Sequence, residues 1–285
     1  MIANILDGLV LGLQFGLLAT GLTLVYGLGG VLNMAYGQIA VVSAISISLL
    51  IDAGLPVILA IILGIVIGGL IGLILDQTLL RSVYRLHEEP RVLLSLLLTL
   101  GLSFIIDGFL TWQFPLEALS IPIRGGAIEI FGVPMRRGSL LASGITLVTF
   151  AGLFIFFRYS SLGLAIRSVI EDEDGARLVG VEPSLMLRLI LIFSGMLAAL
   201  VAVTRSMVTP VDTTSGLSIT VFALIVTVVG GLGSVAGAFF AGLILGVINV
   251  VAADYIGSYV SFIILLVAAG ATILVRPAGL LGVAE

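Results

Sequence analysis

The sequence has 285 residues, of which 60% are hydrophobic and 10% are charged, with a mean hydropathy of +1.33. Soluble domains carry roughly 25% charged residues, so this composition indicates an integral membrane protein. The absence of cysteine excludes disulfides, the absence of lysine excludes a lysine-dependent nucleotide-binding loop, and the net charge of −4 argues against nucleic acid as a partner.

Apolar runs separated by polar breaks predict about eight membrane-spanning helices in a single domain, residues 1–285. A bilayer core of roughly 30 Å needs about 20 apolar residues per helix, and no run shows the alternation of a membrane β-barrel. The predicted fold class is therefore all-α, a polytopic bundle of membrane helices. The predicted spans are residues 5–29, 33–51, 56–80, 92–112, 139–157, 187–207, 219–250 and 258–275.

Glycines recur every four residues in two of these spans. Small residues at this spacing let two helices approach closely, although glycine is also frequent in membrane helices generally. Further glycines interrupt the span 219–250 and predict a broken or re-entrant segment near residues 228–237. The two stripes are Gly8, Gly12 and Gly16, and Gly64, Gly68 and Gly72; the interrupting glycines are Gly230, Gly231, Gly233 and Gly237.

Arginines are concentrated in residues 81–91 and 158–188, which we therefore place in the cytoplasm. Two predicted spans separate these segments, so the two assignments agree. The intervening residues 113–138 then face outside the cell. Within them the sequence IPIRGGAIEI alternates around Gly125 and Gly126, which predicts a small β-hairpin.

The sequence LAIRSVIEDEDGARLVGVE, residues 164–182, gathers charged side chains between two apolar runs. It predicts a helix of about four turns over residues 164–179 that begins at Ser160 or Ser161 and ends at Gly180. Its apolar side comprises Ile166, Val169, Ile170 and Ala176.

Charged residues four apart on this predicted helix are expected to pair, Arg167 with Glu171 and Glu173 with Arg177. The net acidic charge argues against adhesion to an anionic lipid surface and favours a basic protein partner. A solvated loop is the plain alternative. A Mg²⁺ site is disfavoured because consecutive carboxylates on a helix point in different directions, although such oxygens do suit the ion.

Three stretches resemble the membrane permeases of ABC importers for branched-chain amino acids, a family that also includes permeases for urea and short amides. The first is GLTLVYGLGGVLNMAYGQIAVVSA, residues 21–44, and the second is residues 162–202. The third combines VTVVGGLGSVAGAFFAGLILGVIN, residues 226–249, with the terminal VRPAGLLG, residues 275–282. The similarity covers nearly the whole chain.

This resemblance implies that residues 162–182 form the coupling helix, which docks on an ATPase subunit. Its polar contacts would be Arg167, Glu171, Asp174 and Arg177, and Gly180 would end it. The implied partners are a second homologous permease, two cytoplasmic ATPases and an extracytoplasmic substrate-binding protein, in the plasma membrane of a bacterium or archaeon. The permease would need no cofactor or metal and would carry no catalytic residue, and its substrate would be an amino acid, urea or an amide.

Polar residues inside predicted spans are candidates for the translocation path. Where the family commonly has a histidine, a glycine and an acidic residue, this chain has Tyr36, Gly37 and Gln38. With Asn33 they either line the path or bond to neighbouring helices. Asp107 lies deep in the fourth span, where it lines the path, pairs with an arginine such as Arg205, or approaches the outer interface.

Two other classes of function, a secondary transporter and an intramembrane enzyme, are alternatives to this importer. An ion-coupled secondary transporter also uses broken helices and an internal carboxylate, but it gives the acidic cytoplasmic helix no task. An intramembrane enzyme is disfavoured because the single histidine, His87, falls in a predicted loop. Residues 209–216, TPVDTTSG, receive the binding protein, line the entrance or form a plain polar loop.

Overall fold

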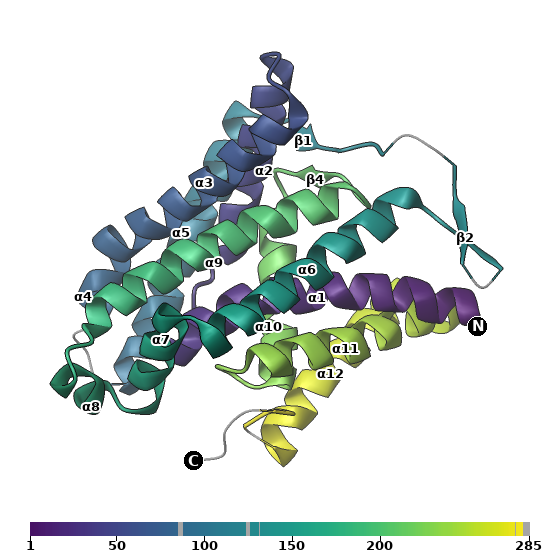
Figure 1. Ribbon diagram of the computed structural model, residues 1–285. Helices are drawn as coiled ribbons and strands as arrows, with labels where there is room; N and C mark the ends of the chain where they lie inside the picture. The colour runs from purple at the N-terminus through teal and green to yellow at the C-terminus, as the bar shows by residue number, and fades with distance from the viewer. Residues whose placement is uncertain (85–87, 124–125, 131, 277, 282–285) are drawn as a thin grey trace.

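The computed structural model describes residues 1–84, 88–123, 126–130, 132–276 and 278–281 (Figure 1). Within these ranges seven helical segments are long and apolar enough to cross a membrane. They are α1 (Ile2–Gly29), residues Val57–Val83, α5 (Glu88–Gln113), α6 (Arg137–Tyr159), α9 (Pro183–Ser206), α11 (Val235–Ile256) and α12 (Ser258–Val275). The predicted polytopic helical bundle is confirmed.

Two further apolar helices are shorter, α2 (Tyr36–Asp52) and α10 (Ser215–Gly230). The prediction counted residues 219–250 as one interrupted span, but the structure divides them between α10 and α11. The segment Val57–Val83 is also composite, because α3 (Val57–Leu75) continues through a π-helical turn, η1 (Asp76–Leu80), into α4 (Arg81–Val83).

The helix α1 lies at the centre of the bundle, beside α11 along its length (Figure 1). Its first glycine stripe makes this possible. A Cβ atom built on Gly8 would lie 2.7 Å from Cα of Val247, and one on Gly12 would lie 2.7 Å from Cα of Leu243. Since lipid provides no hydrophobic drive between helices, close backbone packing of this kind stabilises the pair.

The second glycine stripe faces α9 and α2. A Cβ atom on Gly68 would contact the carbonyl oxygen of Gly195, and one on Gly72 would contact that of Leu191. Gly64 lies instead against Ile47 of α2. Both stripes therefore lie at helix interfaces.

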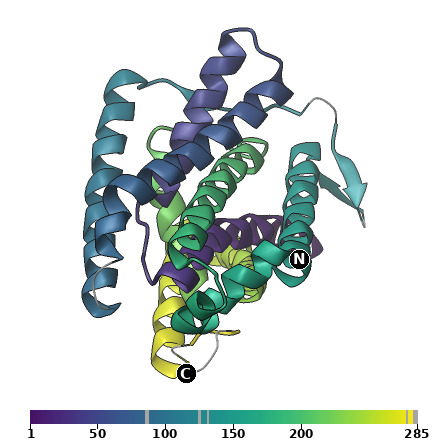
Figure 2. The ribbon, with the colours of Figure 1, turned by 60° about the vertical axis from the view of Figure 1, so that its left-hand side comes forward.

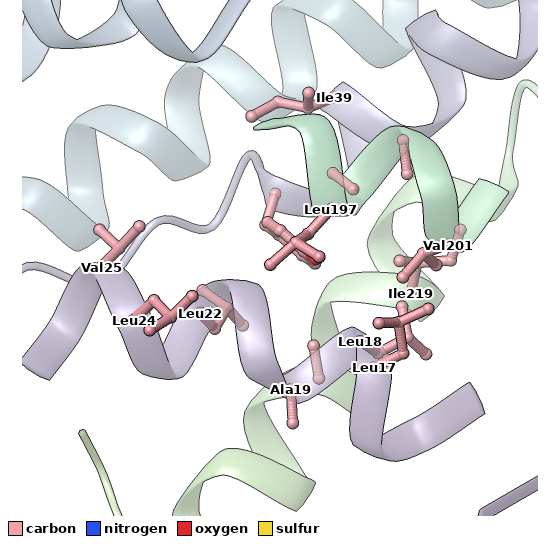
Figure 3. Packing of buried hydrophobic residues seen from close by; sticks show 14 of the residues in the cluster. Leu17, Leu18, Ala19, Leu22, Leu24, Val25, Ile39, Leu197, Val201 and Ile219 are labelled. Atoms are coloured by element: carbon pink, nitrogen blue, oxygen red, sulfur yellow. The ribbon is translucent and has the colours of Figure 1, made fainter. Parts of the chain in front are cut away.

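Large apolar side chains fill the space between α1, α2, α9 and α10 (Figure 3). Leu18 and Leu22 of α1, Ile39 of α2, Val201 of α9 and Ile219 of α10 are all nearly inaccessible. These contacts exclude lipid and water from the middle of the bundle and hold the short helices α2 and α10 in place.

The helix α5 stands at one edge of the molecule (Figure 2) and exposes most of its apolar side chains. Its buried positions include Ser95, Thr99 and Ser103, spaced four residues apart and at most 1% exposed. The usual arrangement of a soluble helix is thus inverted: hydroxyls face the protein and leucines face outward. Such a pattern suits a bilayer, where polar groups are satisfied inside the bundle.

Four short strands connect the helices at the other side of the bundle from α7 (Ser161–Glu171) and α8 (Glu173–Leu178). The strand β1 (Ala118–Leu119) pairs antiparallel with β4 (Val211–Asp212), and β2 (Ile128–Ile130) pairs with β3 (Val133–Met135). The prediction placed the hairpin turn at Gly125 and Gly126. In the observed hairpin Ile130 pairs instead with Val133, and Gly132 between these strands has a φ of 76°, while residues 124–125 lie outside the described residues.

Candidate functional site

The predicted charged helix is two helices, α7 and α8, joined at an angle by Asp172 (Figure 1). Asp172 has extended φ and ψ of −156° and 104°, and its Oδ1 accepts the backbone N–H of Asp174 at 3.1 Å and of Gly175 at 3.0 Å. A single continuous helix was therefore wrong. An aspartate that caps a new helix ends the preceding one, and this competing cap overrides the helical pattern.

The beginning of this unit and its buried face agree more closely with the prediction. Ser160 Oγ accepts the N–H of Gly163 at 2.9 Å, which caps α7. Ile166, Val169 and Ala176 are buried against the membrane helices, as predicted, but Ile170 is 44% exposed. We name residues 160–180 the docking unit, after the role that is proposed for them below.

Charged side chains cover the outer face of the docking unit. Arg177 pairs with Glu173 at 2.7 Å, as predicted, and lies 3.9 Å from Asp174. Arg167 and Glu171 form no ion pair with each other; they line a shallow depression of about 500 Å³ with Leu164 and Val181. Arg167, Glu171, Asp174, Arg177 and Gly180 are all exposed, and Gly180 has a φ of 87° just after α8 ends.

A non-helical segment, residues 30–35, separates α1 from α2 within the bundle. Hydroxyl groups of two other helices satisfy its backbone. Ser95 Oγ accepts the N–H of Leu32 at 3.1 Å, and Thr99 Oγ1 accepts the N–H of Met34 at 2.9 Å. Thr220 Oγ1 of α10 accepts the N–H of Gly37 at 2.9 Å. Non-helical backbone at membrane depth is tolerated only with such partners.

Three of the four predicted path residues, Asn33, Tyr36 and Gln38, lie at the beginning of α2 and are almost fully buried, and the fourth, Asp107, is partly buried. Gln38 Nε2 donates to Asp107 Oδ1 at 3.2 Å, so Asp107 contacts α2 and not Arg205. Asn33 Oδ1 accepts the N–H of Ala35 at 3.0 Å, and Tyr36 packs on Gly21. The structure therefore brings Gln38 and Asp107 together but gives Asn33 and Tyr36 separate neighbours.

Several polar atoms of this cluster make no hydrogen bond with any part of the chain that the structure describes. They are Nδ2 of Asn33, the hydroxyl of Tyr36 and Oε1 of Gln38. Buried polar groups without partners cost roughly 1–3 kcal/mol each, so they mark places where a ligand, water or another conformation supplies the missing bond.

The interrupting glycines form the turn between α10 and α11. Gly231 and Gly233 have φ values of 108° and 89°, which other residues rarely adopt. A Cβ atom on Gly230 would lie 2.5 Å from the carbonyl carbon of Gly237, so the two helix ends meet backbone to backbone. The C-terminal Gly279 packs on Gly231.

The sequence reasoning missed Ser95, Thr99 and Thr220 as partners of the non-helical segment. A signal was present: serine and threonine at four-residue spacing in a leucine-rich run mark one polar face. It also missed the ion pair between Asp76 and Arg188, at 3.4 Å. These residues lie 112 positions apart, so no local pattern connects them.

These features define a multi-pass membrane transport subunit, with broken helices in its bundle and a charged docking unit outside it. The chain belongs to the family described as the permease component of the branched-chain amino acid transport system, whose model matches residues 4–275. It is thus a permease of the ABC type, a transport subunit and not an enzyme, and such permeases work with ATPase and binding-protein partners.

Individual relatives agree with this assignment. The permease protein BraD of a high-affinity branched-chain amino acid transport system in Pseudomonas aeruginosa is 28% identical, covering 98% of this chain and 95% of the relative. LivH of Escherichia coli, with the same description, is 27% identical, covering 97% of this chain and 94% of the relative. The solved structure of PsaBC from Streptococcus pneumoniae in complex with Fab matches 96% of this chain and 95% of that chain at 16% identity, with a TM-score of 0.50, which supports the fold alone.

Proposed function

We propose that this chain is the permease subunit of an ATP-driven importer for branched-chain amino acids in the plasma membrane of a bacterium or archaeon. The observation that carries the proposal is the match, over nearly the full length of both chains, to permeases described as serving this transport. In the proposed assembly the chain pairs with a second homologous permease, two cytoplasmic ATPases and an extracytoplasmic binding protein.

The docking unit is the proposed contact with the ATPase. Its inner face is fixed by Ile166, Val169 and Ala176, and Gly163 lets α7 turn closely against the end of α6. Movement of the unit is therefore transmitted to α6 and α9 instead of being absorbed by a flexible loop. Its exposed acidic side chains suit a basic cleft, and ATP-driven closure of two ATPases would shift the permease helices as rigid bodies.

Alternating access is proposed to open the buried cluster at the beginning of α2. The hydrogen bond between Gln38 and Asp107 joins α2 to α5, and the unpartnered atoms of Asn33 and Tyr36 lie nearby in the chain. When α2 and α5 separate, these groups become available to the polar ends of an amino acid. The glycine turn at residues 230–237 provides backbone freedom on the neighbouring helix pair, and residues 113–138 are proposed to face the binding protein.

The proposal is tested by purifying the protein in mild detergent from its own cells and identifying what remains bound. Wild type should retain two ATPases and a second permease. The double substitution Glu171→Arg and Asp174→Arg should lose the ATPases, because it reverses charge on the docking face. The matched control is Glu129→Arg, an equally exposed position on β2 in the opposite part of the fold, which should retain them.

Substrate is tested separately with the reconstituted assembly and its binding protein. Radiolabelled leucine, isoleucine and valine should accumulate with ATP, whereas urea and acetamide should not. Accumulation of urea instead would favour the urea and amide permeases. A chain that purifies without any ATPase and transports along an ion gradient would replace the proposal with a secondary transporter.

A further inference from the structure

A cavity of about 590 Å³ lies where the docking unit meets the ends of the membrane helices. Its walls come from α8, the first residues of α9, the π turn with α4, and the ends of α1 and α5. This volume is in the range of roughly 300–1,000 Å³ typical of small-molecule sites. The proposed transport path does not include it, since that path centres on the beginning of α2.

The cavity wall carries charges of both signs. Two ion pairs line it, Arg188 of α9 with Asp76 of η1 at 3.4 Å and, within α8, Arg177 with Glu173 at 2.7 Å. Arg81 and Glu182 also line it, and neither forms an ion pair with any residue that the structure describes, although Glu182 accepts a hydrogen bond from the hydroxyl of Ser184 at 2.7 Å. Arg91 lines the cavity too and donates to the carbonyl oxygens of Gly29 and Tyr84. Beyond the two ion pairs the wall thus carries two cationic groups and one anionic group.

A buried donor also points to a missing ligand. Tyr84 lines the cavity, and its hydroxyl makes no hydrogen bond with the described residues. Burial, reinforced by the nearby carboxylate of Asp76, raises the pKa of Tyr84 above its ordinary value, so the hydroxyl keeps its proton and acts as a donor. An unsatisfied buried donor is costly in an empty site and becomes favourable when a ligand oxygen accepts from it.

The π turn explains how these groups reach one place. In η1 the N–H of Arg81 bonds to the carbonyl oxygen of Asp76, five residues back, which inserts one extra residue into the helix. Such turns are rare and occur frequently at functional sites. Here the turn allows Asp76 and Arg81, both from one helix, to line the same cavity.

The rest of the wall combines an apolar part, formed by Leu28, Val169, Pro183 and Leu187, with the polar side chains of Gln77 and Ser184. A carboxylate partner, an ammonium partner and a branched apolar surface together match an α-amino acid zwitterion. A phosphate group fits less well, because Asp76, Glu173 and Glu182 place three carboxylates in the same wall.

We infer that this cavity is a second amino-acid site, facing the cytosol, that binds the zwitterion of a branched-chain amino acid. The carboxylate of the ligand contacts Arg81 and the hydroxyl of Tyr84, its ammonium group contacts Glu182, and its side chain packs on Leu187 and Val169. The inference rests on the proposed transport function, which supplies both the ligand and the cytosolic orientation.

Ligand in this cavity joins the docking unit to the membrane helices. Val169 belongs to α7 of the docking unit, whereas Arg81 belongs to α4 and Leu187 to α9. A bound amino acid therefore restricts the movement of the docking unit that ATP-driven closure requires. Imported product in the cytosol slows the ATPase, which limits accumulation.

The inference is tested on the permease and ATPase complex in lipid nanodiscs, without the binding protein. Leucine binding is measured by scintillation proximity, alongside 4-methylpentanoate, which lacks the ammonium group, and 3-methylbutylamine, which lacks the carboxylate. Each analogue should bind at least about tenfold more weakly than leucine, because a charge-assisted hydrogen bond is lost. Inorganic phosphate should not compete.

Variants assign the binding to this cavity. Arg81→Gln and Glu182→Gln should each weaken leucine binding about tenfold and relieve inhibition of the ATPase by leucine. Tyr84→Phe should weaken binding without lowering thermal stability, because it removes an unsatisfied hydroxyl. The control Arg137→Gln, an exposed arginine at the start of α6, should bind leucine as wild type does.

Leucine uptake with the binding protein is measured in the same preparations. If the preparation takes up leucine but shows no leucine binding in nanodiscs, the inference is overturned and the transport function stands. The same holds if Arg81→Gln and Glu182→Gln leave leucine binding unchanged. Phosphate that displaces leucine, or an analogue that binds as tightly as leucine, also overturns it. Absence of uptake in wild type contradicts the transport function itself.

Discussion

Leu280 donates its backbone N–H to the carbonyl oxygen of Val229 at 2.9 Å, and through this bond the end of the chain closes the last turn of α10. The next residue, Leu281, donates to Gly230 at 3.1 Å. Helix ends leave carbonyl groups without partners, and the C-terminal segment satisfies two of them. The two parts of the third stretch that carries the family resemblance, residues 226–249 and 275–282, thus meet through Leu280 and Leu281.

Gly231→Ala should destabilise this unit. Its φ of 108° lies outside the range that alanine adopts easily, so the substitution should cost about 1–3 kcal/mol. The measurement is thermal inactivation in detergent. Gly270→Ala on α12 is the control: a Cβ atom there meets open space, and stability should be unchanged or slightly higher. If the two substitutions lowered stability equally, the positive φ of Gly231 would not be the cause of the loss.

Gly12→Ala should separate α1 from α11. The added methyl group would lie 2.7 Å from Cα of Leu243, and backbone cannot yield as a side chain can. Overpacking of this kind costs about 1–3 kcal/mol, and the yield of folded protein on size-exclusion chromatography should fall. Gly101→Ala, on the exposed side of α5, should fold as wild type does. An unaffected Gly12 variant would mean that the two helices lie further apart.

Thr99→Val should weaken the support of residues 30–35. Thr99 Oγ1 accepts from Met34 and lies 3.2 Å from the carbonyl oxygen of Leu32, so one substitution removes both contacts at nearly constant volume. Each hydrogen bond of this type contributes roughly 0.6–1.7 kcal/mol in a membrane protein. Differential scanning fluorimetry compares the Thr99→Val variant with Thr149→Val. The hydroxyl of Thr149 bonds within its own helix, to the carbonyl oxygen of Ile145. A larger effect of Thr149→Val would refute the role.

Acid should loosen the turn that begins α10. Burial raises the pKa of Asp212, but hydrogen bonds from Ser215 and Thr214 outweigh it, and the net pKa lies below its ordinary value of 3.8. Because the folded pKa is the lower one, the stabilising contribution is fully present above pH 3.8 and is lost as the pH falls through the folded pKa.

The measurement for this turn is melting temperature against pH, for wild type and Asp212→Asn. Wild type should lose stability more steeply below pH 3.8 than the variant does, and the two should differ most near neutral pH. Parallel curves would show that Asp212 contributes nothing to the pH dependence. The predicted difference favours a structural role for this polar loop, since Asp212 Oδ1 accepts from the N–H of Thr214 and the hydroxyl of Ser215 where α10 begins.

Asp172→Ala should uncouple the ATPase from the permease. The cap that separates α7 from α8 is lost at a cost of about 0.5–2 kcal/mol, so the docking unit loses its fixed angle. Stimulation of ATP hydrolysis by the liganded binding protein should decrease. Asp172→Asn retains an acceptor oxygen and should preserve most of the stimulation; if it fails as badly as alanine, charge and not capping is responsible.

The helical class and the glycine-rich interfaces were accessible from sequence because each depends on short periodic patterns. Gly8, Gly12 and Gly16 share a face whatever the partner helix is. The partner itself, α11, was not predictable, since no local rule selects among apolar helices. Where two local rules competed, as at Asp172, the helical pattern predicted the wrong outcome and the capping side chain prevailed.

The site was predictable in composition more than in arrangement. Intramembrane Gln38 and Asp107 were identified because polar groups in a bilayer are costly. Their mutual hydrogen bond joins residues 69 positions apart and follows only from the packing of α2 on α5. The cavity beside the docking unit was missed for the same reason, because Asp76, Glu173 and Arg188 converge from η1, α8 and α9.

The pairing of α1 with α11 has a consequence for biogenesis. Asn4 donates to Asp254 at 2.7 Å, 250 residues later in the chain. At roughly 5–20 residues per second, a ribosome needs about 10–50 s to make that distance. During this interval α1 lies in the bilayer without α11, and its glycine face is accessible to other proteins. A nascent chain that stops before residue 235 never covers that face, and membrane quality control has a defined surface by which to recognise it.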